Sequence, residues 1–290
     1  MSLDRRRVAA SFGAAAARYD QAAVLQAQVG EELLERTAQL AQKPARILDV
    51  GAGTGRLTAR LRKRFPSSDV VALDLSFGML QAAKRHGGWW KPLPRVQADA
   101  AALPLADASV DVLFSNLCVQ WCDDLPAALL SFRRVLKPGG WLLFTTFGPD
   151  TLKELRAAFA AVDDRAHVHR FLDMHDVGDA VLAQGFADPM LDVERYTLTY
   201  ADTVSLMRDL KAIGARNAHQ DRPRGLMSRR ALHALEAAYE PLRVNGVLPA
   251  SYEVIFAQAQ APLPGAPLKT AGGDLASFSL EDMRARVRRR

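Results

Sequence analysis

The chain has 290 residues, of which 49% are hydrophobic, and a formal net charge of +6. No apolar run approaches the roughly 18–20 residues of a membrane span, and no nucleic-acid-binding module accompanies the positive charge. The Arg-rich N-terminus lacks the apolar stretch of a signal peptide, so we expect a cytoplasmic protein. We also expect it to be a monomer that binds neither membrane nor nucleic acid.

The N-terminal segment, residues 1–40, is predicted to be a helical region that covers a cofactor. A helix carrying Phe12, Tyr19 and Gln26 could fold over the ligand and close the cleft. The alternative is an amphipathic helix whose aromatic side chains simply pack on the domain.

An apolar run and three alternating glycines follow, in the order Arg-Ile-Leu-Asp-Val-Gly-Ala-Gly-Thr-Gly over residues 46–55. With a helix expected over 57–64, this is a strand-to-helix turn whose bare backbone a ligand can touch. The spacing G-x-G-x-G departs from the dinucleotide pattern G-x-G-x-x-G. Asp49 beside the turn would repel phosphate but hold an ammonium group. The turn therefore favours a cofactor with an amino-acid end.

Two further acids follow predicted strands. The strand 70–75 contains Asp74, which lies 19 positions after Gly55, where an acid usually accepts hydrogen bonds from ribose hydroxyls. Asp99 closes another short strand, where an adenine amino group could be read.

The second half of the chain continues the alternation of strands and helices. We expect strands over 111–116, 141–147, 191–200 and 251–257, and helices over 129–136 and 150–162. The sequence Lys-Pro-Gly-Gly at 137–140 is a helix termination signal. The predicted divisions are the helical region 1–40, a core 41–200, a helical lid 201–250, a final core strand 251–258, and a linker with a disordered basic tail 259–290.

Together these features resemble the class I S-adenosylmethionine-dependent methyltransferases. The resemblance implies an α/β, Rossmann-like fold: a seven-stranded, mostly parallel sheet with helices on both faces, an N-terminal helix and a helical lid. The alternative is an ordinary nucleotide-binding or catalytically inactive domain of this type. The cofactor-binding residues that the motifs imply are Tyr19, Gln26, Asp49, Gly51, Ala52, Gly53, Gly55, Asp74, Leu75, Met79, Asp99, Ala100, Asn116 and Leu117.

Several segments resemble one family in particular, the malonyl-acyl-carrier-protein O-methyltransferases of biotin synthesis. They include Ser-Asn-Leu-Cys-Val-Gln-Trp-Cys at 115–122 and Leu-Lys-Ala-Ile-Gly-Ala-Arg-Asn at 210–217, and the similarity spans roughly residues 5 to 258. It implies methyl transfer from S-adenosylmethionine to the free carboxylate of malonyl-acyl-carrier protein or malonyl-CoA. The product would be the methyl ester that begins pimeloyl and biotin synthesis.

That chemistry calls for positioning groups and a cation. A carboxyl group that titrates near 4 is already ionised at neutral pH, so we expect no general base. We also expect no metal. Tyr19, Gln120 and Trp121 are the predicted positioning residues. A guanidinium can clamp both carboxylate oxygens, and Arg170 is the first choice, with Lys211 and Arg216 as alternatives.

The remaining features bear on partners and alternatives. Asn116 is followed by Leu-Cys, where amine methyltransferases carry Pro-Pro-Tyr, so this chain lacks their motif. Cys118 and Cys122 are interpreted as packing residues. Two other functions stay open: methylation of another small carboxylate, and a cofactor-binding assembly factor for respiratory complex I. An acidic carrier protein would dock on basic lid residues by electrostatic steering. The candidate docking residues are Arg208, Lys211, Arg222, Arg224, Arg229 and Arg230.

Overall fold

The structure is a computed structural model that describes residues 3–40, 43–215, 227–265, 268–270 and 273–275. The strands are β1 (Arg46–Val50), β2 (Asp69–Asp74), β3 (Arg95–Gln97), β4 (Val110–Ser115), β5 (Leu136–Phe147), β6 (Ala187–Tyr200), β7 (Leu248–Gln260), β8 (Leu268–Thr270) and β9 (Gly273–Leu275). The α-helices are α1 (Arg5–Ala15), α2 (Tyr19–Ala22), α3 (Val24–Arg36), α4 (Arg56–Arg64), α5 (Phe77–Ala83), α6 (Leu125–Val135), α7 (Lys153–Ala160), α8 (Met174–Ala183), α9 (Thr203–Ala212) and α10 (Arg229–Tyr239). Short 3₁₀ turns lie at η1 (Thr37–Gln39), η2 (Lys84–His86), η3 (Val119–Trp121) and η4 (Glu240–Leu242).

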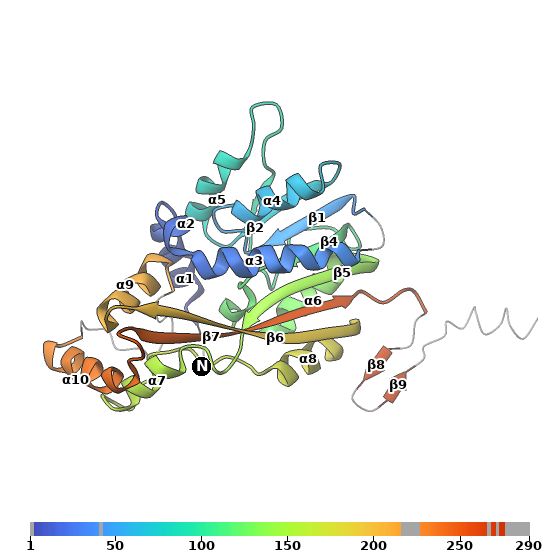
Figure 1. Ribbon diagram of the computed structural model, residues 1–290. Helices are drawn as coiled ribbons and strands as arrows, with labels where there is room; N and C mark the ends of the chain where they lie inside the picture. The colour runs from blue at the N-terminus through green and yellow to red at the C-terminus, as the bar shows by residue number, and fades with distance from the viewer. Residues whose placement is uncertain (1–2, 41–42, 216–226, 266–267, 271–272, 276–290) are drawn as a thin grey trace, which may run out of the picture.

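Seven strands form the central sheet in the order β3-β2-β1-β4-β5-β7-β6 (Figure 1). β7 runs antiparallel to β5 and β6, and the other pairings of this sheet are parallel. The predicted fold class is therefore confirmed, including the antiparallel final strand.

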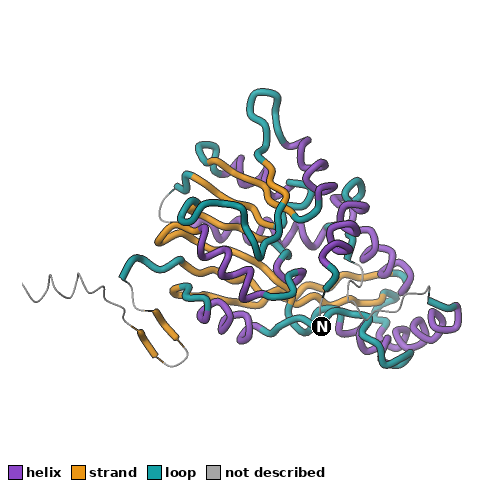
Figure 2. The backbone as a smooth tube through the Cα atoms, turned by 180° about the vertical axis from the view of Figure 1, so that it is seen from behind, coloured by secondary structure: helices purple, strands orange, loops and turns teal. Residues whose placement is uncertain are grey.

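Alternation along the strands divides the core into two layers. In β1, Ile47 packs in a cluster with Val29 and Leu33 of α3, while its neighbour Leu48 packs with Phe132 of α6. Successive side chains of a strand point to opposite faces, so one apolar run can hold a helix layer on each side. α3 crosses the front of the sheet in Figure 1, and other helices cover the opposite face in the reverse view (Figure 2).

The strand order creates a switch point beside β1. Chain connections leave β1 toward β2 on one side, and β4 lies on the other. The segments that follow β1, β2 and β4 therefore meet at one edge of the sheet, which is where open α/β sheets bind ligands. The glycine turn follows β1, Asp74 is the last residue of β2, and Asn116 follows β4.

The boundaries differ from the prediction around residues 125–147. α6 begins at Leu125, where the Asp124 side chain accepts a hydrogen bond from the Ala127 amide, and it ends at Val135. β5 begins at Leu136, so the predicted break at 137–140 belongs to an irregular part of the strand. The register passes from Val110 opposite Leu136 to Val112 opposite Trp141. Positive φ at Gly139 permits this bulge.

Three further elements differ from the sequence-based expectation. The N-terminal region is three successive helices rather than one, with breaks between Ala15 and Tyr19 and at Ala23. β7 begins at Leu248 and continues to Gln260, because it pairs with β6 along nearly its whole length. A β8–β9 hairpin lies within the segment expected to be linker and disordered tail. Residues 276–290 lie outside the described part.

In the chain, α9 and α10 follow β6 and precede β7. They lie at the end of the sheet away from α4 and α5 (Figure 1). α10 buries Leu235 and Tyr239 and packs against α7. The Tyr239 hydroxyl donates to the Pro249 carbonyl at 2.7 Å, which fixes this helix to the start of β7. Among the described residues, no helix has the length and apolar character to cross a membrane.

We expect Phe132→Ala to lower the free energy of unfolding by about 3–5 kcal/mol, because it leaves a cavity in the layer between the sheet and α6. Phe132 is 0% exposed, whereas Leu130 on the same helix is 54% exposed. The matched control Leu130→Ala should change stability by less than about 0.5 kcal/mol in urea denaturation. Equal losses in the two variants would contradict the proposed packing.

Candidate functional site

The three glycines of the turn serve different purposes. All have positive φ, at 74° for Gly51, 54° for Gly53 and 77° for Gly55. A Cβ on Gly51 would lie 2.4 Å from Cys118 Sγ, and one on Gly55 would lie 2.8 Å from the Ala83 Cβ. A Cβ on Gly53 would meet nothing within 4 Å. Gly51 and Gly55 are thus required for close packing, while Gly53 leaves bare backbone open to a ligand.

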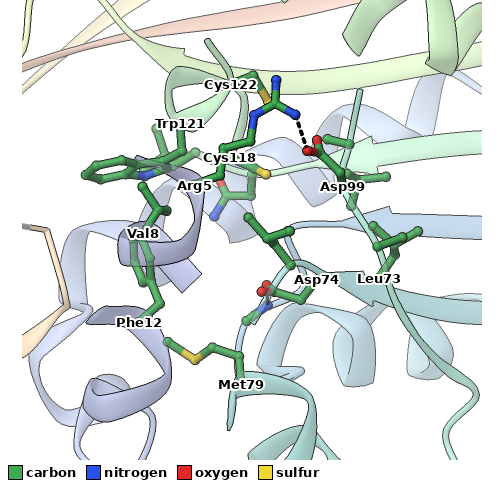
Figure 3. Close-up of a pocket in the computed structure, with 18 of the residues that line it drawn as sticks. Arg5, Val8, Phe12, Leu73, Asp74, Met79, Asp99, Cys118, Trp121 and Cys122 are labelled. Atoms are coloured by element: carbon green, nitrogen blue, oxygen red, sulfur yellow. Dashed lines mark hydrogen bonds and ion pairs between the residues drawn. The ribbon is translucent and has the colours of Figure 1, made fainter. Parts of the chain in front are cut away.

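A cavity lies where β1, β2 and β4 end, and we call it the strand-end cavity (Figure 3). The glycine turn and the acids Asp74 and Asp99 supply its polar wall, and α1 covers it. Its lining residues are Arg5, Val8, Phe12, Tyr19, Val50, Gly51, Gly53, Leu73, Asp74, Leu75, Met79, Ala98, Asp99, Ala100, Ala101, Asn116, Leu117, Cys118, Trp121 and Cys122.

Asp74 ties the end of β2 to the glycine turn. Its Oδ2 accepts from the Gly53 amide at 2.8 Å, and its Oδ1 accepts from the Ser76 amide at 2.7 Å. Desolvation raises the pKa of Asp74, although these two bonds oppose the shift. The carboxylate is held at the cavity wall, where it can accept bonds from ligand hydroxyls.

A second hollow, the glycine-loop cavity, adjoins the first. Its lining includes Gln26, Glu31, Asp49, Ala52 and Thr54. Asp49 is 2% exposed and accepts a 2.6 Å hydrogen bond from Thr58. Burial, aided by the charge of Asp74, raises the pKa of Asp49 to about 7, while the Thr58 bond lowers it. A ligand ammonium placed here would compensate the buried carboxylate.

An ion pair joins the N-terminal segment to the strand-end cavity (Figure 3). Arg5 Nη1 lies 2.6 Å from Asp99 Oδ2, and Arg5 Nε lies 3.7 Å from Asp123. The Leu3 amide also donates to Asp123. These contacts hold α1 across the cavity at the end where Asp99 was predicted to read adenine.

Asn116 acts as a brace. Its Nδ2 donates to the Gln26 carbonyl at 2.8 Å, and its Oδ1 accepts from the Thr145 hydroxyl at 2.8 Å. Thr145 in turn accepts from the Leu117 amide at 2.9 Å. Asn116 lines both cavities, but its amide fixes α3 to the ends of β4 and β5.

A third hollow, the aromatic cavity, lies beside Tyr19 and Trp121. Phe12 contacts both residues, with ring centroids 5.2 Å from Trp121 and 6.4 Å from Tyr19. Tyr19 lines all three cavities, and Trp121 lines the strand-end and aromatic cavities. The aromatic cavity is lined by Leu3, Phe12, Tyr19, Gln26, Leu117, Gln120, Trp121, Phe147, Thr151, Leu152, Leu155, His167, Val168, His169, Phe171, Leu210, Ile213, Ala215 and Tyr252.

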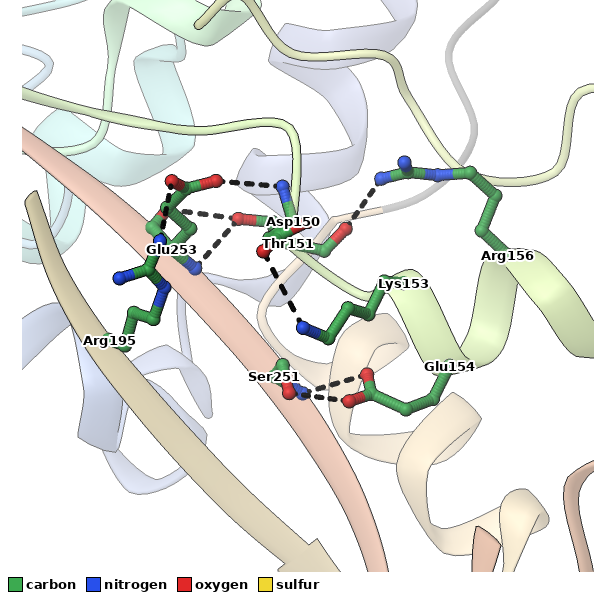
Figure 4. Close-up of polar contacts among 8 residues, drawn as sticks. All are labelled: Asp150, Thr151, Lys153, Glu154, Arg156, Arg195, Ser251 and Glu253. Atoms are coloured by element: carbon green, nitrogen blue, oxygen red, sulfur yellow. Dashed lines mark hydrogen bonds and ion pairs between the residues drawn. The ribbon is translucent and has the colours of Figure 1, made fainter. Parts of the chain in front are cut away.

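The loop between β5 and α7 forms one wall of the aromatic cavity and is fixed to β7 (Figure 4). Glu253, 8% exposed, accepts from the Asp150 amide at 2.8 Å. Thr151 Oγ1 donates to the Glu253 carbonyl at 3.0 Å and accepts from its amide at 3.1 Å. Glu154 accepts from the Ser251 hydroxyl and amide. Thr151 is thereby held in the cavity wall.

Comparison with known proteins shows that this chain resembles methyltransferases well beyond the glycine turn. Residues 48–144 match a protein-family model described as a methyltransferase domain. A malonyl-[acyl-carrier protein] O-methyltransferase of Halorhodospira halophila is 50% identical over 260 residues, covering 89% of this chain and 88% of the relative. One from Gallionella capsiferriformans is 48% identical, covering 90% and 92%, and one from Xylella fastidiosa is 46% identical, covering 98% and 97%. The chain belongs to the malonyl-[acyl-carrier protein] O-methyltransferase family.

Solved structures share the fold at low identity. A Bacillus halodurans protein superposes with a TM-score of 0.59 at 19% identity, covering 80% of this chain and 98% of that chain. The [4+2]-cyclase SpnF gives 0.52 at 20% identity, with 81% of each chain covered. Because one of these proteins is a cyclase, the fold does not by itself define the reaction of this family member.

The structure brings most predicted cofactor residues to two adjoining cavities. Gly55 lines none of the cavities described here and packs against Ala83, so its role is structural. Gln26, Asp49 and Ala52 line the glycine-loop cavity. The strand-end cavity contains Tyr19, Gly51, Gly53, Asp74, Leu75, Met79, Asp99, Ala100, Asn116 and Leu117.

The three predicted carboxylate-binding cations are placed differently. Arg170 is exposed and borders a hollow that adjoins the aromatic cavity, and Lys211 is exposed on α9. Neither lines the aromatic cavity. Arg216 lies outside the described residues. The ionisable side chains that do line this cavity include His167 and His169, from the same run of sequence as Arg170.

Among the ionisable residues that line the strand-end cavity, sequence reasoning missed three. Arg5 stood in an Arg-rich run with no distinguishing feature. Cys118 and Cys122 were interpreted as packing residues, and both line the cavity. Burial raises the pKa of both thiols, that of Cys122 to about 12, so each is present as the neutral thiol.

The raised pKa of Asp49 makes the stability of the ligand-free protein pH-dependent. An acid whose pKa is raised on folding contributes stability below its unfolded value near 4, and this is lost as pH rises through the folded value of about 7. The free energy of unfolding of Asp49→Asn, relative to that of wild type, should therefore rise by about 2–3 kcal/mol from pH 5 to pH 8. Urea denaturation at both pH values measures this. A pH-independent difference would show that Asp49 titrates normally.

Proposed function

We propose that this protein transfers the methyl group of S-adenosylmethionine to the free carboxylate of a malonyl thioester, on acyl carrier protein or CoA. The product is the methyl ester that begins pimeloyl and biotin synthesis. The proposal is carried by the extent of family similarity, which reaches 98% of the chain in one relative and so includes the aromatic cavity and α9 as well as the methyltransferase domain.

The two cavities beside the glycine turn fit this cofactor. Asp49 and Gln26 would take the amino-acid end, and the open backbone at Gly53 would let the ligand approach closely. Asp74 would accept from the ribose hydroxyls, and Asp99 would meet the adenine end. Apolar walls for the adenine ring are supplied by Leu75, Met79, Ala100 and Leu117. When bound, the cofactor supplies an electrophilic methyl group on a sulfonium.

The chain's own task is to position the reactants and exclude water. A malonyl carboxylate is ionised at neutral pH and needs no base. Desolvation and the charges of Asp74 and Asp20 raise the pKa of Tyr19, so its phenol remains a neutral donor. Phe12 and Trp121 supply apolar cover between the strand-end and aromatic cavities. In such a site orientation and desolvation supply the rate enhancement.

We assign recognition of the carboxylate to the aromatic cavity itself. Its polar lining includes Tyr19, Thr151, His167 and His169. His167 Nε2 lies 2.8 Å from Asp163, and its ring stacks 4.0 Å from Phe159, so its orientation is fixed. This assignment replaces Arg170 as the clamp, because Arg170 does not border the cavity that Tyr19 and Trp121 line.

Docking of an acidic carrier protein on α9 and α10 is part of the proposal. Arg208 and Lys211 on α9, and Arg229 and Arg230 on α10, are all exposed. Arg222 and Arg224 lie outside the described residues. Exposed charges of one sign raise the association rate of an oppositely charged partner and lose this effect in salt.

A methyl-transfer assay tests the reaction directly. Purified protein with labelled S-adenosylmethionine should form a base-labile methyl ester on malonyl carrier protein, but none on acetyl carrier protein, which has no free carboxylate. Cofactor binding without transfer to any malonyl thioester would refute the proposed function.

Salt dependence tests the docking surface. Turnover of malonyl carrier protein should fall about tenfold or more between 50 and 500 mM salt, whereas turnover of a small malonyl thioester without the acidic carrier, such as the N-acetylcysteamine derivative, should change much less. Arg229→Gln with Arg230→Gln should flatten the carrier-protein profile. A flat profile in wild type would remove this surface from the mechanism.

A further inference from the structure

A fourth hollow, the side cavity, continues from the aromatic cavity. The two share Leu3, Gln120, Phe147, His169 and Phe171. Beyond these shared residues the side cavity is lined by Val119, Cys122, Asp123, Asp124, Leu125, Pro126, Thr146, Arg170, Leu172 and Val177. A ligand that reacts in the aromatic cavity can therefore extend past Gln120 and His169 toward Arg170.

Gln120 has an unsatisfied acceptor at this junction. The residue is 9% exposed, and its Nε2 donates to the Leu117 carbonyl at 2.7 Å. Its Oε1 is buried and has no hydrogen-bond partner among the described residues. Leaving a buried acceptor unpaired costs about 1–3 kcal/mol, so this position favours a ligand that brings an N–H donor. A malonyl group at neutral pH has no such donor.

Arg170 is the one Arg or Lys among the described residues that line the side cavity. Its side chain is exposed, and no hydrogen bond or ion pair engages it within the described part of the chain. The nearby acids are occupied: Asp123 accepts from the Leu3 amide and pairs with Arg5, and Asp124 caps α6 at Ala127. The guanidinium is thus available to an anion, and its fork matches phosphate oxygens.

We propose that the side cavity holds the phosphopantetheine arm of the thioester substrate, with its phosphate on Arg170 and an amide N–H on Gln120 Oε1. The inference rests on the proposed function, since it explains how a carrier-bound acyl group reaches the aromatic cavity. The arm combines the three features that this path offers partners for: an apolar chain, amide donors and a terminal phosphate.

The apolar part of the path is preformed. Phe147 and Phe171 face each other with ring centroids 5.5 Å apart, and His169 meets Phe171 at 5.1 Å. Phe147, His169 and Phe171 line both the aromatic and the side cavity, as Gln120 does, and Arg170 lines the side cavity. Arg170 thereby acts on the carrier end of the substrate and not on the carboxylate that is methylated.

Binding of 4′-phosphopantetheine and of phosphate-free pantetheine tests this without turnover. Arg170→Gln should weaken phosphopantetheine binding about tenfold in isothermal titration calorimetry, which corresponds to about 1.4 kcal/mol. Pantetheine binding should not change. Arg165→Gln is the matched control, because Arg165 is exposed on the same loop and borders none of the four cavities. Arg170→Lys should restore part of the phosphopantetheine affinity.

Gln120→Leu provides the second arm of the test. It should weaken both probes equally, because it removes the acceptor for the amide and leaves Arg170 intact. The melting temperature and S-adenosylhomocysteine binding of each variant report whether the fold and the cofactor cavities are preserved.

Kinetics then separates this role from a carboxylate clamp. With Arg170→Gln, KM should rise about tenfold for malonyl-CoA and malonyl carrier protein, with kcat unchanged and with no effect on malonyl N-acetylcysteamine. An equal loss on all three substrates would overturn the inference in favour of the clamp, and no change in any probe or substrate would overturn it outright. If wild type methylates no malonyl thioester, the proposed function fails, while the binding experiment still decides the role of Arg170.

Discussion

The carboxylate of Asp74 connects the parts of the cofactor site. It accepts one backbone amide from the glycine turn and one from its own strand end, so the loops after β1 and β2 are held by a single charged group. Asp49 lies nearby, fully buried, and the charge of Asp74 adds to the desolvation that raises the pKa of Asp49. The lining of the two cavities carries five acids, Asp20, Glu31, Asp49, Asp74 and Asp99, against two arginines, Arg5 and Arg56, and Arg5 is paired with Asp99. This excess of acids, two of which are desolvated, favours a ligand that brings its own positive charge and hydroxyl donors.

The N-terminal helices form a wall common to the strand-end, glycine-loop and aromatic cavities. Tyr19 borders the strand-end, glycine-loop and aromatic cavities, and Arg5 fixes α1 to Asp99. On the opposite side, a Cβ on Gly214 would lie 3.1 Å from the Phe12 Cα, so the end of α9 packs directly on α1. The strand-end and aromatic cavities therefore share one cover, and a displacement of α1 would open both.

The sheet and the glycine turn were predictable because their signals are local. Apolar runs of strand length followed by Gly51 or Asp74 identify both the strand and its end, and parallel strands must present those ends at one edge. Boundaries were less certain where tertiary pairing decides them. β7 is longer than its sequence suggested because β6 pairs with it over its length, and β5 extends back to Leu136 across a bulge that the Lys-Pro-Gly-Gly signal concealed.

The sequence alone determined the fold class, the cofactor motifs and the resemblance to one methyltransferase family, because these depend on residue types at fixed spacing. Tertiary structure decided which cavity each of these side chains borders. His169 and Arg170 are adjacent in the chain, yet His169 borders the aromatic cavity and Arg170 only the side cavity. Arg5 meets Asp99 across 94 positions of sequence. Such pairings follow from the packing of distant elements, which no local pattern records.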